Sequence, residues 1–373
     1  MSGSSYGNMF RISTWGESHG KAVGVVIDGV PAGLNFNTDM VQKFLDRRKP
    51  GQNEFTTKRN ESDLVEFMSG LFEGKTTGTP IAMIVRNKDQ HSQDYNDIAT
   101  YYRPGHADYT YDAKYGFRDY RGGGRSSGRE TIGRVCGGAL ASEILKQLDI
   151  SISTYTKSIG DVSIDYGKSQ SDNIFKNPFS MPDLDAAAKV EDLARQTSRN
   201  KDSLGGIIEC VISGLPRGIG EPVFEKLDSN LSKGILSIGA VKGIEFGSGF
   251  EGTKKTGYEN NDQFIADDLG KISKKSNNAG GILGGISDGS EIVFRSAIKP
   301  TSSIGKTQQT VNKDGENIDI NIKGRHDPLI VPRAVVVIES MAAITLVDML
   351  FMNMSSRMDN IISFYRQDGE NEK

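Results

Sequence analysis

The chain has 373 residues, of which 36% are hydrophobic, and its formal net charge at pH 7 is −3. This slightly acidic balance argues against a protein built mainly to coat nucleic acid. The most apolar segment, residues 331–354, is interrupted by Arg333, Glu339 and Asp348, so it predicts no membrane span.

Glycine is the unusual component of the composition. It accounts for 44 of 373 residues, about 12%, where about 7% is usual. No triplet period accompanies the glycines, so they indicate unusual loops rather than collagen. The two cysteines, Cys136 and Cys210, lie far apart in apolar patterns, which favours free thiols in a reduced, cytoplasmic setting. The first residues show no signal-peptide pattern.

The first elements are predicted to be two strands and a helix. Residues 10–15 alternate like a short strand, which ends at Gly16-Glu17-Ser18-His19-Gly20, and the β-branched residues 23–30 predict a buried strand. Residues 40–48 have helical spacing after an N-cap pattern at 37–39. The helix ends in Arg47 and Arg48, which could serve either as partners of the helix dipole or as ligand-binding groups.

Residues 63–68 and 81–85 predict two further strands, joined by a glycine-rich loop. Within this loop the spacing from Gly70 to Gly74 is one residue too short for a phosphate-binding P-loop, and no helical pattern follows Thr76. The polar segment 87–96 contains His91, which we interpret as a surface histidine.

The stretch 103–134 carries the strongest functional signal. Three successive glycines, 122–124, favour left-handed backbone and close approach to a ligand. They lead into a helical pattern at 130–148, and a helix start offers N–H groups to an anion. The surrounding arginines add donors for phosphate or carboxylate. A solvated basic loop with a serine N-cap is the alternative.

The second half of the chain alternates strands and helices around further glycine-rich loops. Helices are predicted at 183–196 and 223–236, strands at 206–215, 240–246 and 290–298, and a strand running into a long apolar helix at 334–352. The remainder of 149–205 is mixed and polar. A GxGxxG pattern at 247–252 lacks the following helix that a dinucleotide site requires. No repeat or long linker divides the chain, so one α/β domain spanning 1–373 is expected, with a polar, frayed tail at 366–373.

Three histidines, His19, His106 and His326, each occur in a loop bounded by glycine or proline, beside arginine, serine or an acid. The spacing of His, Cys, Asp and Glu indicates no metal site. With Asp327 as a candidate carboxylate, these loops predict an acid–base active site that binds a ligand carrying several negative charges.

Five motifs together resemble the chorismate synthase family. They are Gly16–Gly20 (GESHG), 103–108 (RPGHAD), 120–131 (YRGGGRSSGRET), 299–303 (KPTSS) and 324–328 (GRHDP). The resemblance is collinear and covers about residues 6–350. It implies that 5-enolpyruvylshikimate 3-phosphate loses phosphate and its C6 hydrogen in an anti 1,4-elimination that yields chorismate, the last common step of the shikimate pathway and of aromatic amino-acid biosynthesis.

The resemblance also implies a fold, a cofactor and an assembly. The fold would be α+β, a β-α-β sandwich core with long glycine-rich loops, assembled as a homotetramer in the cytoplasm. The cofactor would be reduced FMN, which lends an electron to the C–O bond and recovers it. NADPH could supply that reduction directly, but no nicotinamide motif is visible, so an external flavin reductase is favoured.

The resemblance assigns roles to individual residues. His106 would protonate the departing phosphate, His19 would favour the monoanionic reduced flavin, and Asp327 would help to deprotonate flavin N5. The substrate anions would be bound by Ser18, Arg48, Arg103, Ser127, Arg129 and Arg325. FMN would be bound by Arg125, Ser126, Ser127, Gly239, Ala240, Gly284, Lys299, Pro300, Thr301, Ser302, Ser303 and Arg325.

The chain departs from the family pattern at two positions. Glu54 occurs where a basic residue is usual at the substrate mouth, so either Lys58 or Arg59 substitutes for it or substrate binding is weaker. Gly239 stands where many relatives have asparagine, so only its backbone is left to contact the flavin. Two other protein classes agree less well with the sequence. An RNA-binding protein would need repeated RGG units and a basic chain. A nicotinamide-dependent dehydrogenase is not supported, because the GxGxxG pattern at 247–252 lacks the helix that a dinucleotide site requires.

Overall fold

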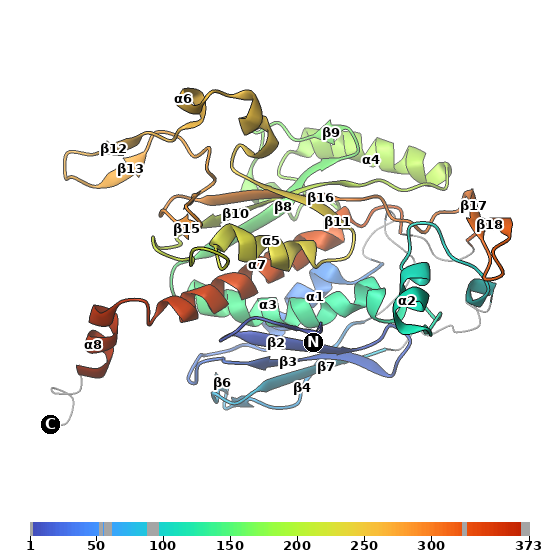
Figure 1. Cartoon of the computed structure of the whole chain (residues 1–373), viewed down its shortest axis with the longest axis horizontal. Helices are drawn as coiled ribbons and strands as arrows, with labels where there is room; N and C mark the ends of the chain where they lie inside the picture. Colours follow the sequence, from blue (N-terminus) through green and yellow to red (C-terminus); the bar gives the residue numbers. More distant parts are fainter. Residues whose placement is uncertain (1–2, 52–54, 56–61, 88–96, 323–326, 367–373) are drawn as a thin grey trace.

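The computed structural model describes residues 3–51, 55, 62–87, 97–322 and 327–366. Two five-stranded antiparallel sheets form the body of the molecule (Figure 1). The first has the order β1-β2-β3-β7-β4, made of β1 Ser5–Tyr6, β2 Arg11–Gly16, β3 Ala22–Asp28, β7 Ile81–Arg86 and β4 Val65–Phe67. The second has the order β11-β16-β10-β8-β9, made of β11 Val241–Phe246, β16 Ile292–Ile298, β10 Gly206–Ser213, β8 Ser151–Ile159 and β9 Val162–Ser163.

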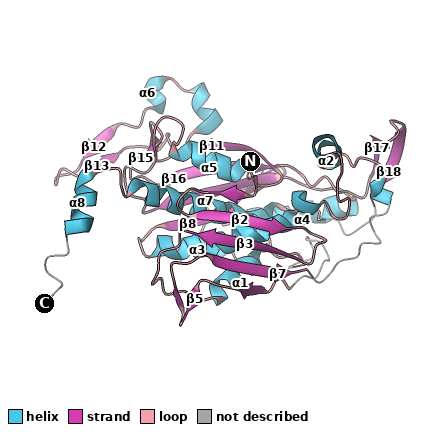
Figure 2. Cartoon of the chain, turned by 60° about the horizontal axis from the view of Figure 1, so that its bottom comes forward, coloured by secondary structure: helices cyan, strands magenta, loops and turns pink. Residues whose placement is uncertain are grey.

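The strands of the first sheet bury the apolar side chains that their sequences predict to be buried. Val23, Val25 and Ile27 of β3 are buried, and in the neighbouring strand β7 the residues Ile81 and Val85 are buried too. Figure 2 shows β2, β3 and β7 side by side. Because successive side chains of a strand point to opposite faces, these residues build one apolar face that helices cover.

Three helices, α1 Asp39–Arg48, α3 Thr131–Lys146 and α7 Val331–Asn353, form the centre of the molecule. Helix α3 packs on β2 and β3 of the first sheet, whereas α7 packs on β8 and β10 of the second. The helices α3 and α7 also pack against each other (Figure 1). By length and composition α7 could cross a membrane, but 78% of its apolar window is buried inside the protein, as in the core helix of a soluble fold.

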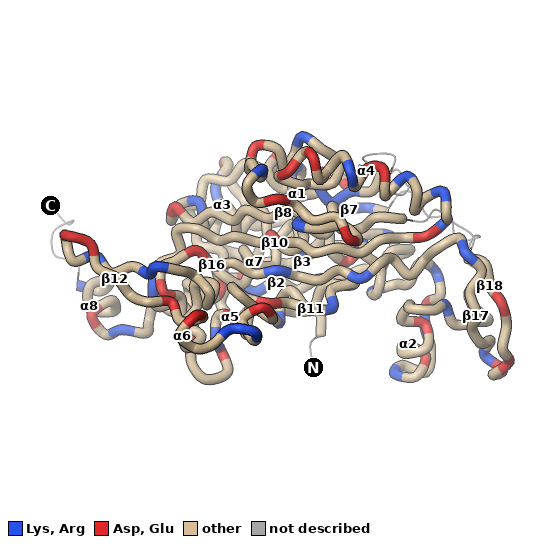
Figure 3. Tube along the Cα trace, turned by 90° about the horizontal axis from the view of Figure 1, so that it is seen from above, with Lys and Arg blue, Asp and Glu red and all other residues tan. Residues whose placement is uncertain are grey.

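Shorter elements surround this body. They are α2 Asp108–Tyr115, α4 Leu184–Arg199, α5 Leu227–Leu236, α6 Gly257–Asn260, α8 Met358–Arg366 and the hairpins β5 Leu71–Phe72 with β6 Lys75–Thr76, β12 Phe264–Ala266 with β13 Ile272–Lys274, β14 Ile282–Leu283 with β15 Ile286–Ser287, and β17 Thr307–Val311 with β18 Asn317–Asn321. Figure 3 shows α2 and β17–β18 projecting at one end of the molecule, with β12–β13 and α8 at the other.

Several sequence predictions are confirmed and others are wrong. The predicted strands near residues 10, 23, 81, 206, 240 and 290 and the helices near 40, 131 and 184 are present. The predicted strand at the start of 334–352 is wrong, because Val331–Asn353 is helical throughout. Strand β8 was not predicted, and the helix expected from residue 223 begins at Leu227.

The fold class is α+β, as the family resemblance implies. The α/β class expected from the order of elements is wrong, because every strand pair in the two sheets is antiparallel. Residues 367–373 of the expected polar tail lie outside the described residues. The same is true of His91, Glu54, Lys58, Arg59, Arg325 and His326.

Candidate active site

A cavity of about 890 Å³ is formed where α1 ends and α3 and α7 begin. Loops around residues 19, 105, 123, 239, 300 and 327 complete its wall, and most of the charged side chains on that wall are basic. Among the described residues of the wall, the cationic side chains are Arg48, Arg103, Arg125, Arg129, Arg134, Lys299 and Arg333, against two carboxylates, Glu130 and Asp327. Pockets for single drug-sized ligands span about 300–1,000 Å³, so this cavity lies near the upper end of that range.

His19 is held in place by the first of the three glycines. Ser18 Oγ lies 3.2 Å from His19 Nδ1 and donates a hydrogen bond of 3.1 Å to the carbonyl of Gly122. A Cβ on Gly122 would lie 2.1 Å from His19 Cε1, and the φ of Gly122 is +61°. Glycine is therefore required here both for the turn and for the imidazole packed against it.

His106 occurs in a loop that is tied to the motif at 299–303. Ser302 Oγ donates to the carbonyl of Gly105 at 2.9 Å, and Lys299 Nζ hydrogen-bonds Ser302 Oγ. His106 Nδ1 lies 2.9 Å from the carbonyl of Pro104. Since a carbonyl only accepts, Nδ1 carries the proton of the neutral ring and Nε2 is the nitrogen that titrates.

Burial lowers the pKa of His106, and the neighbouring charge of Arg103 lowers it further. The hydrogen bond to Pro104 and the charge of Asp108 oppose these effects but do not cancel them. The pKa of Lys299 is also lowered, by burial and by the charge of Lys242. Both shifts indicate a partly desolvated, electropositive site.

The glycine-rich stretch folds into two short 3-10 turns that precede α3, Gly124–Ser126 and Gly128–Glu130. Ser127 separates them, and its side chain accepts from the N–H of Arg129. Arg125 points its guanidinium at strand β2, where it donates to the carbonyl of Gly16 at 3.1 Å and to Thr14 Oγ1 at 2.7 Å. Its guanidinium therefore fixes this turn on the first sheet.

Arg48 and Arg129 meet at one buried carboxylate that the sequence analysis did not identify. Arg48 Nη2 lies 2.6 Å from Asp63 Oδ2, and Arg129 Nη1 lies 3.1 Å from Asp63 Oδ1. Burial lowers the pKa of Arg48 to about 10. Arg129 Nε also donates to Asn87 Oδ1, while Asn87 Nδ2 donates to the carbonyls of Glu17 and Gly20.

Arg103 is held in the same way by Asp108. Its Nε and Nη2 donate to the two carboxylate oxygens, each at 2.8 Å, and Arg118 lies 2.9 Å from Asp108 Oδ1. Burial would raise the pKa of Asp108, but the hydrogen bonds from Arg103 and the charge of Arg118 outweigh it, so the pKa lies below its ordinary value. Asp108 therefore remains ionised beside the cavity.

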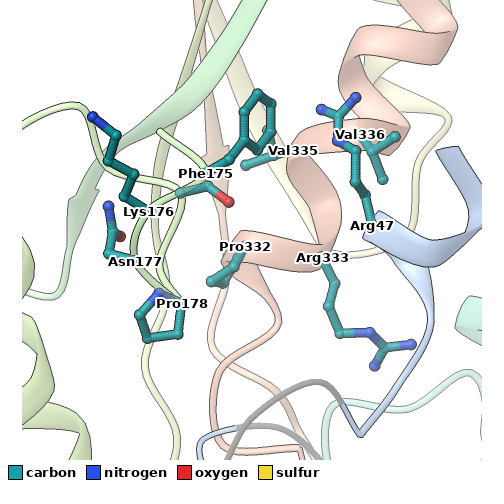
Figure 4. Close-up of a pocket in the computed structure, with 10 residues that line it drawn as sticks. Arg47, Phe175, Lys176, Asn177, Pro178, Pro332, Arg333, Val335 and Val336 are labelled. Atoms are coloured by element: carbon teal, nitrogen blue, oxygen red, sulfur yellow. The ribbon is translucent and has the colours of Figure 1, made fainter. Parts of the chain in front are cut away.

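Asp327 forms an ion pair with Arg333 of α7, and Arg333 Nε donates to the carbonyl of Arg48 at 3.0 Å. Arg333 also lines a smaller cavity of about 320 Å³, together with Arg47 and Phe175. In Figure 4, Arg333 extends away from Val336, while Arg47 extends alongside it. Arg47 is neutralised by Glu339 and covers the Phe175 ring.

Most of the predicted site residues line the large cavity. They are His19, Arg48, Arg103, His106, Arg125, Ser126, Ser127, Arg129, Gly239, Ala240, Lys299, Pro300, Thr301, Ser302, Ser303 and Asp327. Ser18 lies directly behind His19 and is buried. Arg325 lies outside the described residues.

Gly284 is the exception among the predicted residues. It lies in the turn between β14 and β15 and does not line the cavity of its own chain. The family resemblance alone assigns it to FMN, and a sequence resemblance carries no information on which subunit's cavity a loop approaches.

The cavity also contains residues that the sequence analysis missed. Tyr111 and Tyr115 of α2 line it, as do Arg134 of α3 and Arg333 of α7. Arg134 belongs to the basic stretch 103–134, so its charge was visible in the sequence. For the tyrosines the four-residue spacing, which puts both on one face of a helix, was an available signal.

The arrangement suits acid–base chemistry on an anionic ligand. It combines two imidazoles, the Asp327 carboxylate and a cationic wall in a partly buried cavity. Among the described residues, no group of three or more His, Cys, Asp or Glu side chains could hold a metal ion.

Comparison with known proteins gives one consistent result. Residues 10–351 match the family described as chorismate synthase. Chorismate synthase of Lachnoclostridium phytofermentans is 64% identical over 98% of this chain and 100% of that protein. The enzyme of Cytophaga hutchinsonii is 51% identical over 95% and 99%. A solved crystal structure of chorismate synthase superimposes with a TM-score of 0.75 and 27% identity, covering 97% of both chains.

Proposed function

The chain belongs to the chorismate synthase family, and we propose that the cationic cavity is where it converts 5-enolpyruvylshikimate 3-phosphate to chorismate. This reaction is a carbon–oxygen lyase reaction, the loss of phosphate and of the C6 hydrogen, and it belongs to the shikimate pathway. The observation that carries the assignment of the site is convergence. Motifs around residues 19, 106, 125, 300 and 327, far apart in the sequence, line one cavity.

The charge of the wall matches the charge of the substrate. 5-Enolpyruvylshikimate 3-phosphate carries one phosphate and two carboxylates, and arginine forks bind such groups in a bidentate manner. We assign substrate binding to Arg48, Arg103, Arg129 and Arg325, with Ser18 and Ser127 as hydroxyl partners. The first three are oriented by Asp63 or Asp108.

Two residues are proposed to take part in proton transfer. His106 would protonate the departing phosphate from Nε2, since Nδ1 is engaged with the carbonyl of Pro104. Asp327, oriented by its ion pair with Arg333, would help to deprotonate flavin N5. His19, packed against Gly122, would be the imidazole beside the cofactor.

The cavity fits a reduced flavin. Its volume lies near the upper end of the range for small-molecule pockets, the left-handed glycines 122–124 let a ligand approach the backbone closely, and Lys299 adds a partly desolvated cation for a phosphate. Bound reduced FMN would supply the electron that opens the C–O bond. The residues proposed to hold it are Arg125, Ser126, Ser127, Gly239, Ala240, Lys299, Pro300, Thr301, Ser302, Ser303 and Arg325, with Gly284 contributed by another subunit.

The remaining assignments are proposals about the whole protein. We propose one domain with a β-α-β sandwich core, because α3 and α7 pack on different sheets and on each other. We propose a cytoplasmic homotetramer that receives its reduced flavin from an external reductase rather than through NADPH bound to this chain.

A single anaerobic assay tests the function. Purified protein with reduced FMN and 5-enolpyruvylshikimate 3-phosphate should form chorismate, and oxidised FMN should not support the reaction. Replacing His106 by Ala should lower turnover by about 10²–10⁴-fold, as expected for a lost general acid. Near-normal turnover of His106→Ala would show that the role of His106 is assigned wrongly. NADPH added without a reductase tests the source of electrons.

A further inference from the structure

We propose that Asp63 is a positioning residue, the carboxylate that holds Arg48 and Arg129 in the geometry that binds the anionic substrate. The proposal rests on the proposed function of the cavity and assigns a role to a residue outside the five motifs. Asp63 does not line the cavity. It therefore acts through the two arginines, which do.

The geometry is that of a bridge. Each carboxylate oxygen of Asp63 faces a different guanidinium, 2.6 Å from Arg48 Nη2 and 3.1 Å from Arg129 Nη1. The two arginines come from different elements, one from the end of α1 and the other from the turn before α3. Asp63 therefore fixes the position of one arginine relative to the other.

Electrostatics explains why a carboxylate is needed at this point. The side chain of Asp63 is 0% exposed, and those of Arg48 and Arg129 are 2% and 8% exposed. Two buried like charges repel each other, and each is costly to desolvate unless paired. A guanidinium carries five N–H donors, and the bridge uses one from each arginine. The carboxylate thus orients both guanidinium groups while leaving the three side chains a net positive charge.

The backbone of Asp63 is itself fixed in an uncommon conformation. Its φ is +44°, in the left-handed region that aspartate tolerates better than most residues. Gln42 of α1 donates from Nε2 to the carbonyl of Asp63 at 3.3 Å and accepts from the N–H of Val65 at 3.2 Å. The residue is thereby anchored to the helix that carries Arg48, as a precise positioning group requires.

The second arginine has a further link that a purely structural ion pair would not need. Arg129 Nε donates to Asn87, and Asn87 donates to the turn that carries His19. The bridge therefore connects the substrate-binding arginines to the loop of a proposed catalytic residue. A substitution of Asp63 should therefore lower the affinity for the substrate before it affects other properties of the enzyme.

The test is the isosteric variant Asp63→Asn, which keeps the shape and removes the charge. We expect the KM for 5-enolpyruvylshikimate 3-phosphate to rise about 10- to 100-fold, as for a misplacement of about 1 Å in a binding group. The affinity for FMN should change by less than about twofold, because Asp63 is paired with Arg48 and Arg129 and with none of the groups assigned to FMN. Calorimetric titration with the substrate alone should show the same loss.

Two control variants separate positioning from stability. Asp348→Asn removes another buried carboxylate, which accepts N–H groups of Met9 and Phe10 and does not line the cavity; it should lower Tm without changing KM. Glu66→Gln removes a half-exposed carboxylate paired with Arg86 and should change neither quantity. A double-mutant cycle with Arg129→Ala should show that Asp63→Asn raises KM by a smaller factor once that arginine is absent, because only Arg48 is then left for Asp63 to position.

The outcomes are distinguishable. A wild-type KM in folded Asp63→Asn, or an equal loss of FMN and substrate affinity, overturns the positioning role and leaves the proposed function intact. Absence of chorismate formation by the unaltered enzyme overturns the function, and the calorimetric titration then still reports on Asp63. Should Asp63→Asn fail to fold, Asp63→Glu keeps the charge but shifts it by one methylene; a raised KM supports the role and an unchanged KM overturns it.

Discussion

At the scale of single residues, the cationic side chains of the cavity are held by fixed acceptors. Arg103 is bound by Asp108, Arg48 and Arg129 by Asp63, and Arg125 by the strand β2. Donors that are already oriented lose less conformational entropy when an anion binds and need no reorganisation during the reaction. The site is therefore organised by acids and carbonyls behind the basic wall as much as by the basic residues themselves.

His106 should make substrate binding depend on pH. Its pKa is lowered by burial and by Arg103, so the ring is mainly neutral near pH 7 before an anion binds. A phosphate dianion beside Nε2 favours the imidazolium and raises that pKa. Substrate binding should therefore take up a proton, measured by calorimetry in buffers of different ionisation enthalpy. Equal proton uptake by the wild type and His106→Gln would contradict this assignment.

The lowered pKa of His106 also makes the stability of the folded protein depend on pH. Because the folded protein binds this proton less readily than the unfolded chain, stability from His106 is complete above pH about 6.5. It is lost as the pH falls from there towards the lower folded pKa. The Tm of the wild type should therefore fall relative to that of His106→Gln only below about pH 6.5.

Gly122→Ala should impair the site by displacing His19. The new Cβ would lie 2.1 Å from His19 Cε1, so the ring must move, and turnover should fall by about tenfold or more. Gly74→Ala is the matched control, since Gly74 also has a positive φ, +75°, but nothing lies within 4 Å of its Cβ. Both variants should lose about 1–2 kcal/mol of stability. Full activity of Gly122→Ala would show that His19 does not need its observed position.

At this scale the sequence predicted the groups that face the ligand better than those behind them. His19, His106 and Arg129 occur in long motifs, and glycines 122–124 marked the loop. Asp63 and Asn87 are single polar residues next to predicted strands, and no spacing relates them to arginines 15 to 66 residues away. A contact of that kind depends on the tertiary fold.

At the scale of elements, the crossing of α3 and α7 determines where the cavity forms. Both helices begin at the cavity, which is lined by Thr131 at the start of α3 and by Arg333 near the start of α7. Gly138 allows their close approach, since a Cβ there would lie 2.1 Å from Ser340 Cβ. The small residues therefore set the distance between the two helices, and with it the spacing of the groups at their N-terminal ends.

Gly138→Ala should destabilise the protein although alanine favours helix formation. The added methyl must push α7 away or strain its backbone, because Ser340 Cα also lies 2.4 Å from that position. Overpacking of this kind costs about 1–3 kcal/mol, more than the gain of about 1 kcal/mol in helix propensity. Urea denaturation measures the loss. The control is Gly257→Ala in α6, where nothing lies within 4 Å, and it should not be destabilised.

Elements with a clear period were predicted from the sequence, and those with overriding tertiary contacts were not. β3 is a β-branched run with buried alternate residues, and its strand was identified. The run at 334–338 is β-branched too, but it is buried between the second sheet and α3 and extends a helix of 23 residues. β8 has polar residues such as Thr154 and Thr156 in buried positions, so it lacked the apolar alternation that marks a strand.

At the scale of the whole molecule, an apolar arm stands apart from the body. The hairpin β12–β13 projects at the end of the molecule away from α2 (Figure 1). Phe264, Leu269 and Ile272 of this hairpin are 64%, 94% and 54% exposed. Apolar side chains gathered on a projecting element are typical of a subunit interface, because a monomer gains nothing from exposing them. The arm is therefore the surface on which we expect copies of the chain to associate.

Charge placed on this arm should break the assembly and weaken cofactor binding. The double variant Phe264→Asp/Ile272→Asp would bury carboxylates in any contact that the arm makes with another copy. Burying a carboxylate that has no cationic partner is energetically unfavourable. Light scattering should give a mass near four times that of the chain for the wild type and a smaller mass for the variant. Phe72→Asp, at an equally exposed aromatic residue on β5, should keep the wild-type mass.

The same variant tests the place of Gly284. This residue does not line the cavity of its own chain, so a contact with FMN must come across a subunit interface. FMN titration of the dissociated variant, followed by flavin fluorescence, should show a weaker affinity than that of the wild type, while Phe72→Asp should match the wild type. An unchanged FMN affinity in a folded, dissociated variant would remove Gly284 from the flavin site, because each chain would then bind the cofactor with its own residues alone.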